Sequence, residues 1–191
     1  MSSPYQFNKI DIMVRFFRDR QLLKNVNLNQ KNILDFGSGL DVKRIKKLYH
    51  NTKEAILIDR FEKDFQEQNC NFFGYDHAKD LNFDKLNEIL KGKKFDFIIM
   101  MAIIEHIEYP EKLLIFLKKF LKKNGFFFIT APSKSAKYVL EFLAYRLKII
   151  NEALVREHKL YYNLYEYKEL ARKTELKLEK FKFFEFRMNT M

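Results

Sequence analysis

Short apolar runs alternate along the chain with segments in which apolar residues recur every three or four positions. The runs have the length and flanking polar or glycine residues of buried strands. They are 33–36, 55–58, 71–75, 95–100 and 126–130. Helical spacing occurs in 7–23, 42–49, 83–90, 111–121 and 135–150. Regular alternation of the two kinds predicts an α/β fold with a parallel sheet covered on both faces.

The first 30 residues are predicted to hold an N-terminal amphipathic helix that precedes the first strand. Its apolar positions at helical spacing are Ile10, Met13, Val14 and Phe17. Asp41 stands directly before the next helical segment, where a short acid can accept hydrogen bonds from the free amides of the first turn. Asp41 is therefore expected to cap a helix that runs to Tyr49.

The first strand ends in an acid and a tight glycine turn, Asp35-Phe36-Gly37-Ser38-Gly39. Two close glycines let the backbone turn sharply and approach a ligand. The second strand closes on Asp59, 20 residues beyond Gly39, where such folds place the acid that binds ribose hydroxyls. Val42 stands where a dinucleotide fingerprint needs its third glycine. These residues predict a nucleoside-containing cofactor other than a dinucleotide.

The order of motifs resembles that of the class I S-adenosylmethionine-dependent methyltransferases from about residue 32 to the end of the chain. The resemblance is carried by Asp35-x-Gly37-x-Gly39, Asp59, the strand 95–100, the pair Glu105-His106, Gly125 and the strand 126–130. This order is similar to that in the branch of the family that methylates small molecules.

The resemblance implies one methyltransferase domain, 1–191, with a Rossmann-like, doubly wound, mostly parallel sheet. Seven strands are expected, of which the last is reversed. Residues 178–186 resemble the sixth strand, and 187–191 resemble the start of the seventh. A helical cap, 134–165, is expected between strands five and six, above the cofactor cleft.

S-adenosylmethionine is the cofactor that the resemblance implies. The implied binding residues are Asp35, Gly37, Ser38, Gly39, Asp59, Arg60, Asp76 and Met101. In the family, the glycine turn lies under the methionine part and the acid after strand two binds the ribose diol. Asp76 would lie near the adenine, or Asp80 would if the strand ends later, and either could instead cap a helix. Asp35 could simply bracket the glycine turn.

Glu105, His106 and His158 are the candidate catalytic residues. By family geometry His106 lies beside the reactive methyl, and an imidazole can accept the proton of a hydroxyl acceptor. The alternative is that His106 only holds its loop. His158 in the cap could contact the acceptor, act as the base, or form a hydrogen bond within the cap.

Some O-methyltransferases hold a divalent ion with Glu-x-x-Glu-His and a distant histidine. This chain has Glu105, His106 and His158, but Ala102 replaces the first glutamate. Losing one anionic ligand weakens a site for a hard cation. No metal is therefore predicted.

The net charge of +11 could mark a nucleic-acid partner. However, lysine outnumbers arginine by 27 to 9 and is spread over most segments. Specific recognition of phosphates and bases favours arginine clusters instead. Solvated faces and a biased amino-acid composition explain the charge better, and RNA remains the alternative partner.

The predicted acceptor is a hydroxyl of a small molecule, such as a sugar or a surface-polysaccharide precursor. The stretch from His158 to Tyr162 resembles that of cell-surface sugar and polysaccharide methyltransferases. The alternatives are an RNA methyltransferase and a catalytically silent cofactor-binding subunit. A cytoplasmic location is expected from the absence of an apolar run of membrane-spanning length and from the single cysteine, Cys70. The oligomeric state is left open.

Overall fold

One mixed sheet of eight strands forms the centre of the computed structural model, which describes residues 9–39, 41–60, 64–76, 81–142, 146, 159–184 and 188–191. The strand order is β3-β4-β2-β1-β5-β6-β8-β7. The strands are β1 (Asn32–Phe36), β2 (Glu54–Asp59), β3 (Phe65–Glu67), β4 (Cys70–Gly74), β5 (Phe95–Met101), β6 (Leu121–Pro132), β7 (Phe183–Phe184) and β8 (Asn189–Thr190).

The pairing confirms a mostly parallel sheet with a reversed strand. Strands β4, β2, β1, β5 and β6 pair in parallel, whereas β8 runs antiparallel to both β6 and β7. The expected number of seven strands is one too few, because the short β3 adds an antiparallel strand beside β4. Of the expected sixth strand, 178–186, the structure describes residues 178–184, and within these only β7 is a strand. Such two- and three-residue strands form through tertiary pairing, which leaves little periodicity in the sequence.

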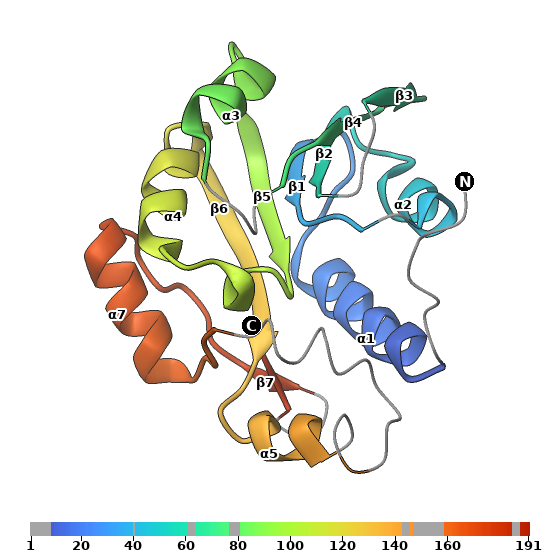
Figure 1. The fold of residues 1–191 in the computed structure, drawn as a ribbon. Helices are drawn as coiled ribbons and strands as arrows, with labels where there is room; N and C mark the ends of the chain where they lie inside the picture. Colours follow the sequence, from blue (N-terminus) through green and yellow to red (C-terminus); the bar gives the residue numbers. More distant parts are fainter. Residues whose placement is uncertain are drawn as a thin grey trace.

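Helices cover both faces of the sheet (Figure 1). One face carries α1 (Lys9–Asn25) and α2 (Val42–Tyr49), and the other carries α3 (Phe83–Leu90), α4 (Pro110–Lys118) and α7 (Leu164–Thr174). Asp41 caps α2, as predicted, by accepting a hydrogen bond from the Arg44 amide at 3.0 Å. None of the helices described is both long enough and apolar enough to cross a membrane.

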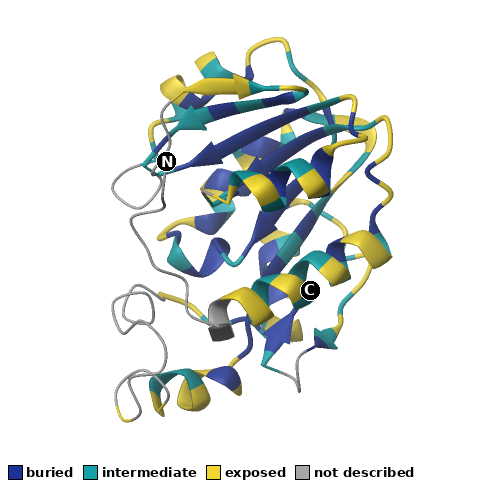
Figure 2. Ribbon diagram, turned by 90° about the vertical axis from the view of Figure 1, so that its right-hand side faces the viewer, coloured by how far each residue is buried: buried dark blue, intermediate teal, exposed yellow. Residues whose placement is uncertain are grey.

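Side chains alternate between two apolar cores along the central strands. In β5, Ile98 and Met100 face α3, α4 and α7, whereas Phe97 and Ile99 face α1 and α2. Figure 2 shows the buried strands between helices whose outer surfaces are exposed. This alternation follows from the two-residue repeat of a strand and explains why both faces of the sheet are apolar.

The N-terminal helix is present, but it packs differently from the prediction. Met13 is exposed, Val14 and Phe17 are half-buried, and the side chain of Ile10 lies outside the described residues. The buried anchor of α1 is Leu22, and Val26, directly after the helix, is buried beside it. The side of α1 that faces the sheet is polar near the start of the helix, so the spacing of apolar residues could not identify it.

The central strands β1, β2, β5 and β6 end on the same side of the molecule, which we call the carboxyl end of the sheet. The 3₁₀ helix η1 (Ile104–His106) follows β5 there, and α5 (Ala136–Glu141) follows β6. The start of the predicted cap, 134–165, is therefore helical. Residues 143–145 and 147–158 lie outside the described residues, so the cap as a whole stays a prediction.

Candidate active site

The glycine turn after β1 has a backbone that only glycine adopts easily. Gly37 has φ of +87° and Gly39 has φ of +72°. The Gly37 amide donates a hydrogen bond to the Ile58 carbonyl at 2.7 Å, which ties the turn to β2. A Cβ on Gly37 would lie 2.8 Å from Cγ1 of Ile103. Gly37 is thus required both by its backbone angle and by close packing against the loop after β5.

Replacing Gly37 with alanine is expected to lower the free energy of unfolding by about 2 kcal/mol, because it adds backbone strain and a clash with Ile103. The matched control is Gly92→Ala. Gly92 has φ of +72° but nothing within 4 Å of the added Cβ, so the free energy of unfolding is expected to fall by only about 1 kcal/mol. Urea unfolding of both variants measures the difference. Equal losses of unfolding free energy in the two variants would show that the Ile103 side chain can move aside with no energetic penalty.

Asp59 lies directly against this turn, as the sequence predicted. It ends β2, is 6% exposed, and its Oδ2 accepts a hydrogen bond from the Gly39 amide at 2.9 Å. The Asp59 carbonyl also accepts a hydrogen bond from the Tyr75 amide at 3.0 Å, which joins β2 to the end of β4. A carboxylate fixed at this point can accept hydrogen bonds from ribose hydroxyls.

Arg15 of α1 is a site residue that the sequence pattern did not predict. Its guanidinium nitrogens lie 3.5 Å from the position of a Cβ on Gly39. The turn is therefore flanked by an anion, Asp59, and a cation, Arg15. Its only sequence signal is the repeat Arg15, Arg18, Leu22, which places two arginines on the same side of the helix as a core residue.

Asp35 is placed beneath the turn and is 1% exposed. The hydroxyl of Tyr49 donates a hydrogen bond to its Oδ2 at 2.7 Å. Burial raises the pKa of Asp35 to about 6, although the charge of Arg44 and the Tyr49 hydrogen bond both act to lower it. This geometry favours the alternative in which Asp35 brackets the turn.

Arg44 joins α2 to α1 and to the turn. Its Nε and Nη2 donate to the two carboxylate oxygens of Asp19 at 2.7 and 2.5 Å, and its Nη1 donates to the Ser38 carbonyl at 3.2 Å. Such a bidentate pair fixes geometry more firmly than a single hydrogen bond. Neither Arg44 nor Asp19 was predicted, because both lie in ordinary helical patterns.

The remaining predicted cofactor residues also lie at the carboxyl end of the sheet. Ser38 is 4% exposed, and Met101, which ends β5, is 9% exposed. Arg60 follows β2, and Asp76 lies two residues after β4; both are half-buried. Asp80, the alternative to Asp76, lies outside the described residues. The structure brings these residues to one end of the sheet.

Glu105 lies in η1 and is 1% exposed, with no hydrogen-bond partner for its Oε2 among the described residues. Burial raises the pKa of its carboxyl to about 7, and the nearby charge of Arg18 opposes that shift. Burial, and after it the charge of Glu105, raises the pKa of Tyr162. Residues from α1, from η1 and from the segment before α7 thus meet around one buried carboxyl.

His106 follows Glu105 and is only half-buried. Its amide donates to the Ile103 carbonyl at 3.0 Å, which closes the 3₁₀ turn. His158 lies outside the described residues. The next residue, Lys159, donates its amide to the Glu105 carbonyl at 2.8 Å, so the later part of the predicted cap, 134–165, contacts this turn.

Ala102 stands between β5 and η1 with a left-handed backbone, φ of +54°, and its amide donates to the Thr130 carbonyl at 2.9 Å. A left-handed non-glycine residue often marks a functional turn. In the part of the chain that the structure describes, no three His, Cys, Asp or Glu side chains gather to hold a metal. Because His158 is outside that part, the absence of a metal stays a prediction.

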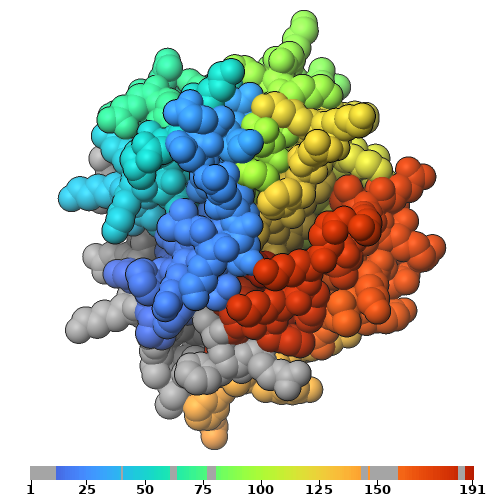
Figure 3. Space-filling view, turned by 180° about the vertical axis from the view of Figure 1, so that it is seen from behind, coloured from blue at the N-terminus to red at the C-terminus, as the bar shows by residue number. Residues whose placement is uncertain are grey.

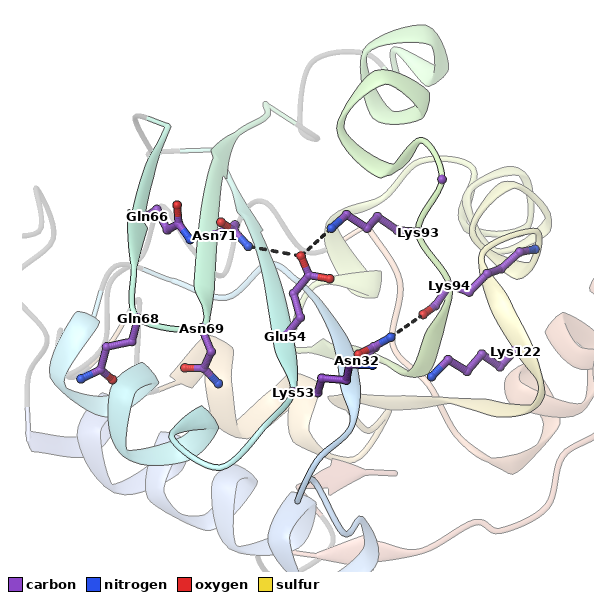
Figure 4. Close-up of a pocket in the computed structure, with 11 residues that line it drawn as sticks. Asn32, Lys53, Glu54, Gln66, Gln68, Asn69, Asn71, Lys93, Lys94 and Lys122 are labelled. Atoms are coloured by element: carbon purple, nitrogen blue, oxygen red, sulfur yellow. Dashed lines mark hydrogen bonds and ion pairs between the residues drawn. The ribbon is translucent and has the colours of Figure 1, made fainter.

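A polar groove of about 660 Å³ lies at the opposite end of the sheet, where the central strands begin (Figure 4). It is lined by Asn32, Lys53, Glu54, Gln66, Gln68, Asn69, Asn71, Gly92, Lys93, Lys94 and Lys122. Lys93 pairs with Glu54 at 2.5 Å, and Lys122 pairs with Asp96 at 2.7 Å. Parallel α/β sheets bind ligands at their carboxyl ends, so this groove is not the candidate active site.

The residues at the carboxyl end fit S-adenosylmethionine group by group. The cation of Arg15 suits its carboxylate, and the Asp59 carboxylate, held by the Gly39 amide, suits its ribose diol. The apolar Ile103, which packs on Gly37, suits the less polar part between them.

Comparisons with known proteins agree with this fit. The family model described as "Methyltransferase domain" matches residues 12–180. A SAM-dependent methyltransferase from Archaeoglobus fulgidus has the same fold, with a TM-score of 0.62 and 19% identity over 93% of this chain and 79% of that chain. The plantazolicin methyltransferase BpumL, in complex with SAH and a monoazolic desmethylPZN analog, superposes with a TM-score of 0.57. Its sequence identity is 18% over 86% of this chain and 63% of that chain.

No relative matches among the curated proteins. The solved structures, at these identities, show the fold, whereas the family match covers most of the chain. The chain belongs to the methyltransferase domain family and is an S-adenosylmethionine-dependent methyltransferase.

Proposed function

We propose that the protein methylates a hydroxyl group of a small molecule, such as a sugar or a surface-polysaccharide precursor. The observation that carries this proposal is the half-buried imidazole of His106 at the carboxyl end of β5. A hydroxyl must lose its proton as its oxygen attacks a methyl group. A partly exposed imidazole is suited to accept that proton near neutral pH.

The cofactor supplies the electrophilic methyl group, and the chain's own residues supply position. Arg15 and Asp59, on either side of Gly39, would hold the carboxylate and the ribose diol of the cofactor. The backbone carbonyl of Glu105 accepts hydrogen bonds from the amides of Lys159 and Leu160 at 2.8 and 3.4 Å, which fixes the later part of the predicted cap against η1. Alignment of the methyl group with the acceptor hydroxyl then provides most of the rate enhancement.

Charges near the cleft support a small acceptor over RNA. Lys134, after β6, forms an ion pair with Glu166, and Lys159 forms one with Glu108 at 3.4 Å. Lysines do gather at the groove of Figure 4, but that groove is at the far end of the sheet. An RNA methyltransferase would need unpaired cations beside the reacting methyl.

The proposal is tested by incubating the protein with S-adenosylmethionine labelled in its methyl group and three acceptor pools: nucleotide sugars, lipid-linked sugars and total RNA. Label in a sugar pool that survives mild base supports an O-methyl ether. Label in RNA alone would replace this proposal with an RNA substrate. Cofactor binding with no label in any hydroxyl compound would favour a catalytically silent subunit.

Replacing His106 with asparagine is expected to lower kcat on the acceptor by about 100-fold, because proton acceptance is lost while alignment remains. Affinity for S-adenosylhomocysteine should stay within about twofold. The matched control is His50→Asn, which changes an exposed histidine at the end of α2. Full activity of the His106 variant would remove His106 from the mechanism.

A further inference from the structure

The outer face of α1 exposes four large apolar side chains. Ile12 is 58% exposed, Met13 51%, Phe16 60% and Leu23 58%. At 100° per residue these positions fall within an arc of about 100° on one side of the helix. In Figure 3, α1 lies at the molecular surface beside the C-terminal segment. We call this arc the outer face of α1.

Basic residues accompany this apolar arc. Arg20 and Lys24 are exposed and lie on the same side of the helix as Met13 and Phe16. Asp19, at the border of the arc, is bound by Arg44. At the end of α1, the Lys180 ammonium donates to the Asn25 side chain at 2.7 Å. The outer face therefore combines apolar area with positive charge.

We propose that the outer face of α1 docks on an anionic lipid surface. Apolar side chains on an interfacial helix enter the boundary between headgroups and acyl chains, while lysine and arginine reach the lipid phosphates. Attraction of the anionic surface for a protein of net charge +11 acts in the same direction. The proposal does not depend on the identity of the methyl acceptor.

Two other occupants fit this face less well. A second copy of the chain would also carry a net charge of +11, and its outer face would offer Arg20 and Lys24 no carboxylate that is not already bound. A nucleic acid could stack a base on Phe16 but would leave Ile12 and Leu23 without an apolar partner. A lipid surface satisfies both the apolar and the basic residues.

Docking in this orientation would hold the active site close to the lipid surface. The inner face of the same helix carries Arg15, beside Gly39, and Arg18, whose charge acts on Glu105. The outer and inner faces are separated only by the width of one helix, about 10 Å. Such a position would suit an acceptor whose reactive end projects from a membrane.

The first experiment uses the absence of tryptophan from the chain. In a Phe16→Trp variant, the indole is a single fluorescent reporter on the outer face. Its emission should shift to shorter wavelength with vesicles that contain equal parts of phosphatidylcholine and phosphatidylglycerol, and much less with phosphatidylcholine alone. The matched control is Ile115→Trp, since Ile115 is 45% exposed on α4, on the other face of the sheet.

The second experiment measures partition of the full-length protein into the same vesicles by sedimentation. Ile12→Ser with Phe16→Ser, and separately Arg20→Glu with Lys24→Glu, should each reduce partition about tenfold or more. Ile115→Ser should change it less than about twofold. A thermal shift with S-adenosylhomocysteine verifies that each variant is folded.

Three results would overturn the proposal. The first is equal fluorescence shifts for Trp at positions 16 and 115, or none at either. The second is a dimer in solution that the Ile12 and Phe16 changes dissociate, which would make this face a subunit interface. The third is RNA binding at physiological salt that the same changes abolish.

Discussion

Replacing Asp59 with alanine is expected to weaken the binding of S-adenosylhomocysteine by roughly 30- to 150-fold, or about 2–3 kcal/mol. The carboxylate is fixed by the Gly39 amide at 2.9 Å and is nearly buried, so its bonds to a ribose diol form with little water competing. Its loss also releases the Gly39 amide, which holds the turn in shape. Titration calorimetry measures the affinity.

Two variants make this experiment specific. Asp59→Asn keeps an oxygen that can accept the Gly39 hydrogen bond but lacks the charge, so its affinity should lie between those of the alanine variant and the wild type. Asp96→Ala removes a carboxylate at the start of β5, where it binds Lys122, and should leave the affinity unchanged. Undiminished binding by Asp59→Ala would place the ribose elsewhere.

Replacing Glu105 with glutamine is expected to stabilise the protein at alkaline pH by up to about 3 kcal/mol. Burial raises the pKa of this carboxyl from 4.5 to about 7 in the folded protein. Between these values the folded state keeps a proton that the unfolded state has released. The free energy of unfolding of the wild type should therefore fall as pH rises from about 4.5 to about 7, and then level off.

The glutamine side chain has no proton to release, so the two proteins should be equally stable near pH 4 and diverge above it. Urea unfolding at a series of pH values measures the divergence. Glu108→Gln, which changes an exposed carboxyl three residues further on, is the control and should follow the wild type. Parallel curves for wild type and Glu105→Gln would mean that Arg18 keeps Glu105 ionised.

Local sequence determined the elements that depend on local chemistry. The helix at 83–90 follows from its helical spacing, the strand predicted at 95–100 and observed as Phe95–Met101 follows from its apolar run, and the cap of α2 follows from Asp41. The glycine turn and Asp59 were predictable because backbone angle and strand order fix them. Those features are sufficient to identify the family and its cofactor.

Only the tertiary structure decided which polar residues meet at the site. Arg15 lies beside Gly39, 24 positions later in the sequence. The hydroxyl of Tyr49, in α2, donates a hydrogen bond to Asp35. The same is true of burial: Met13 is exposed and Glu105 is enclosed, the reverse of what hydropathy predicts for each. Which side of α1 faces the sheet, and what encloses the turn after β5, are set by packing between distant segments, and no local pattern records that packing.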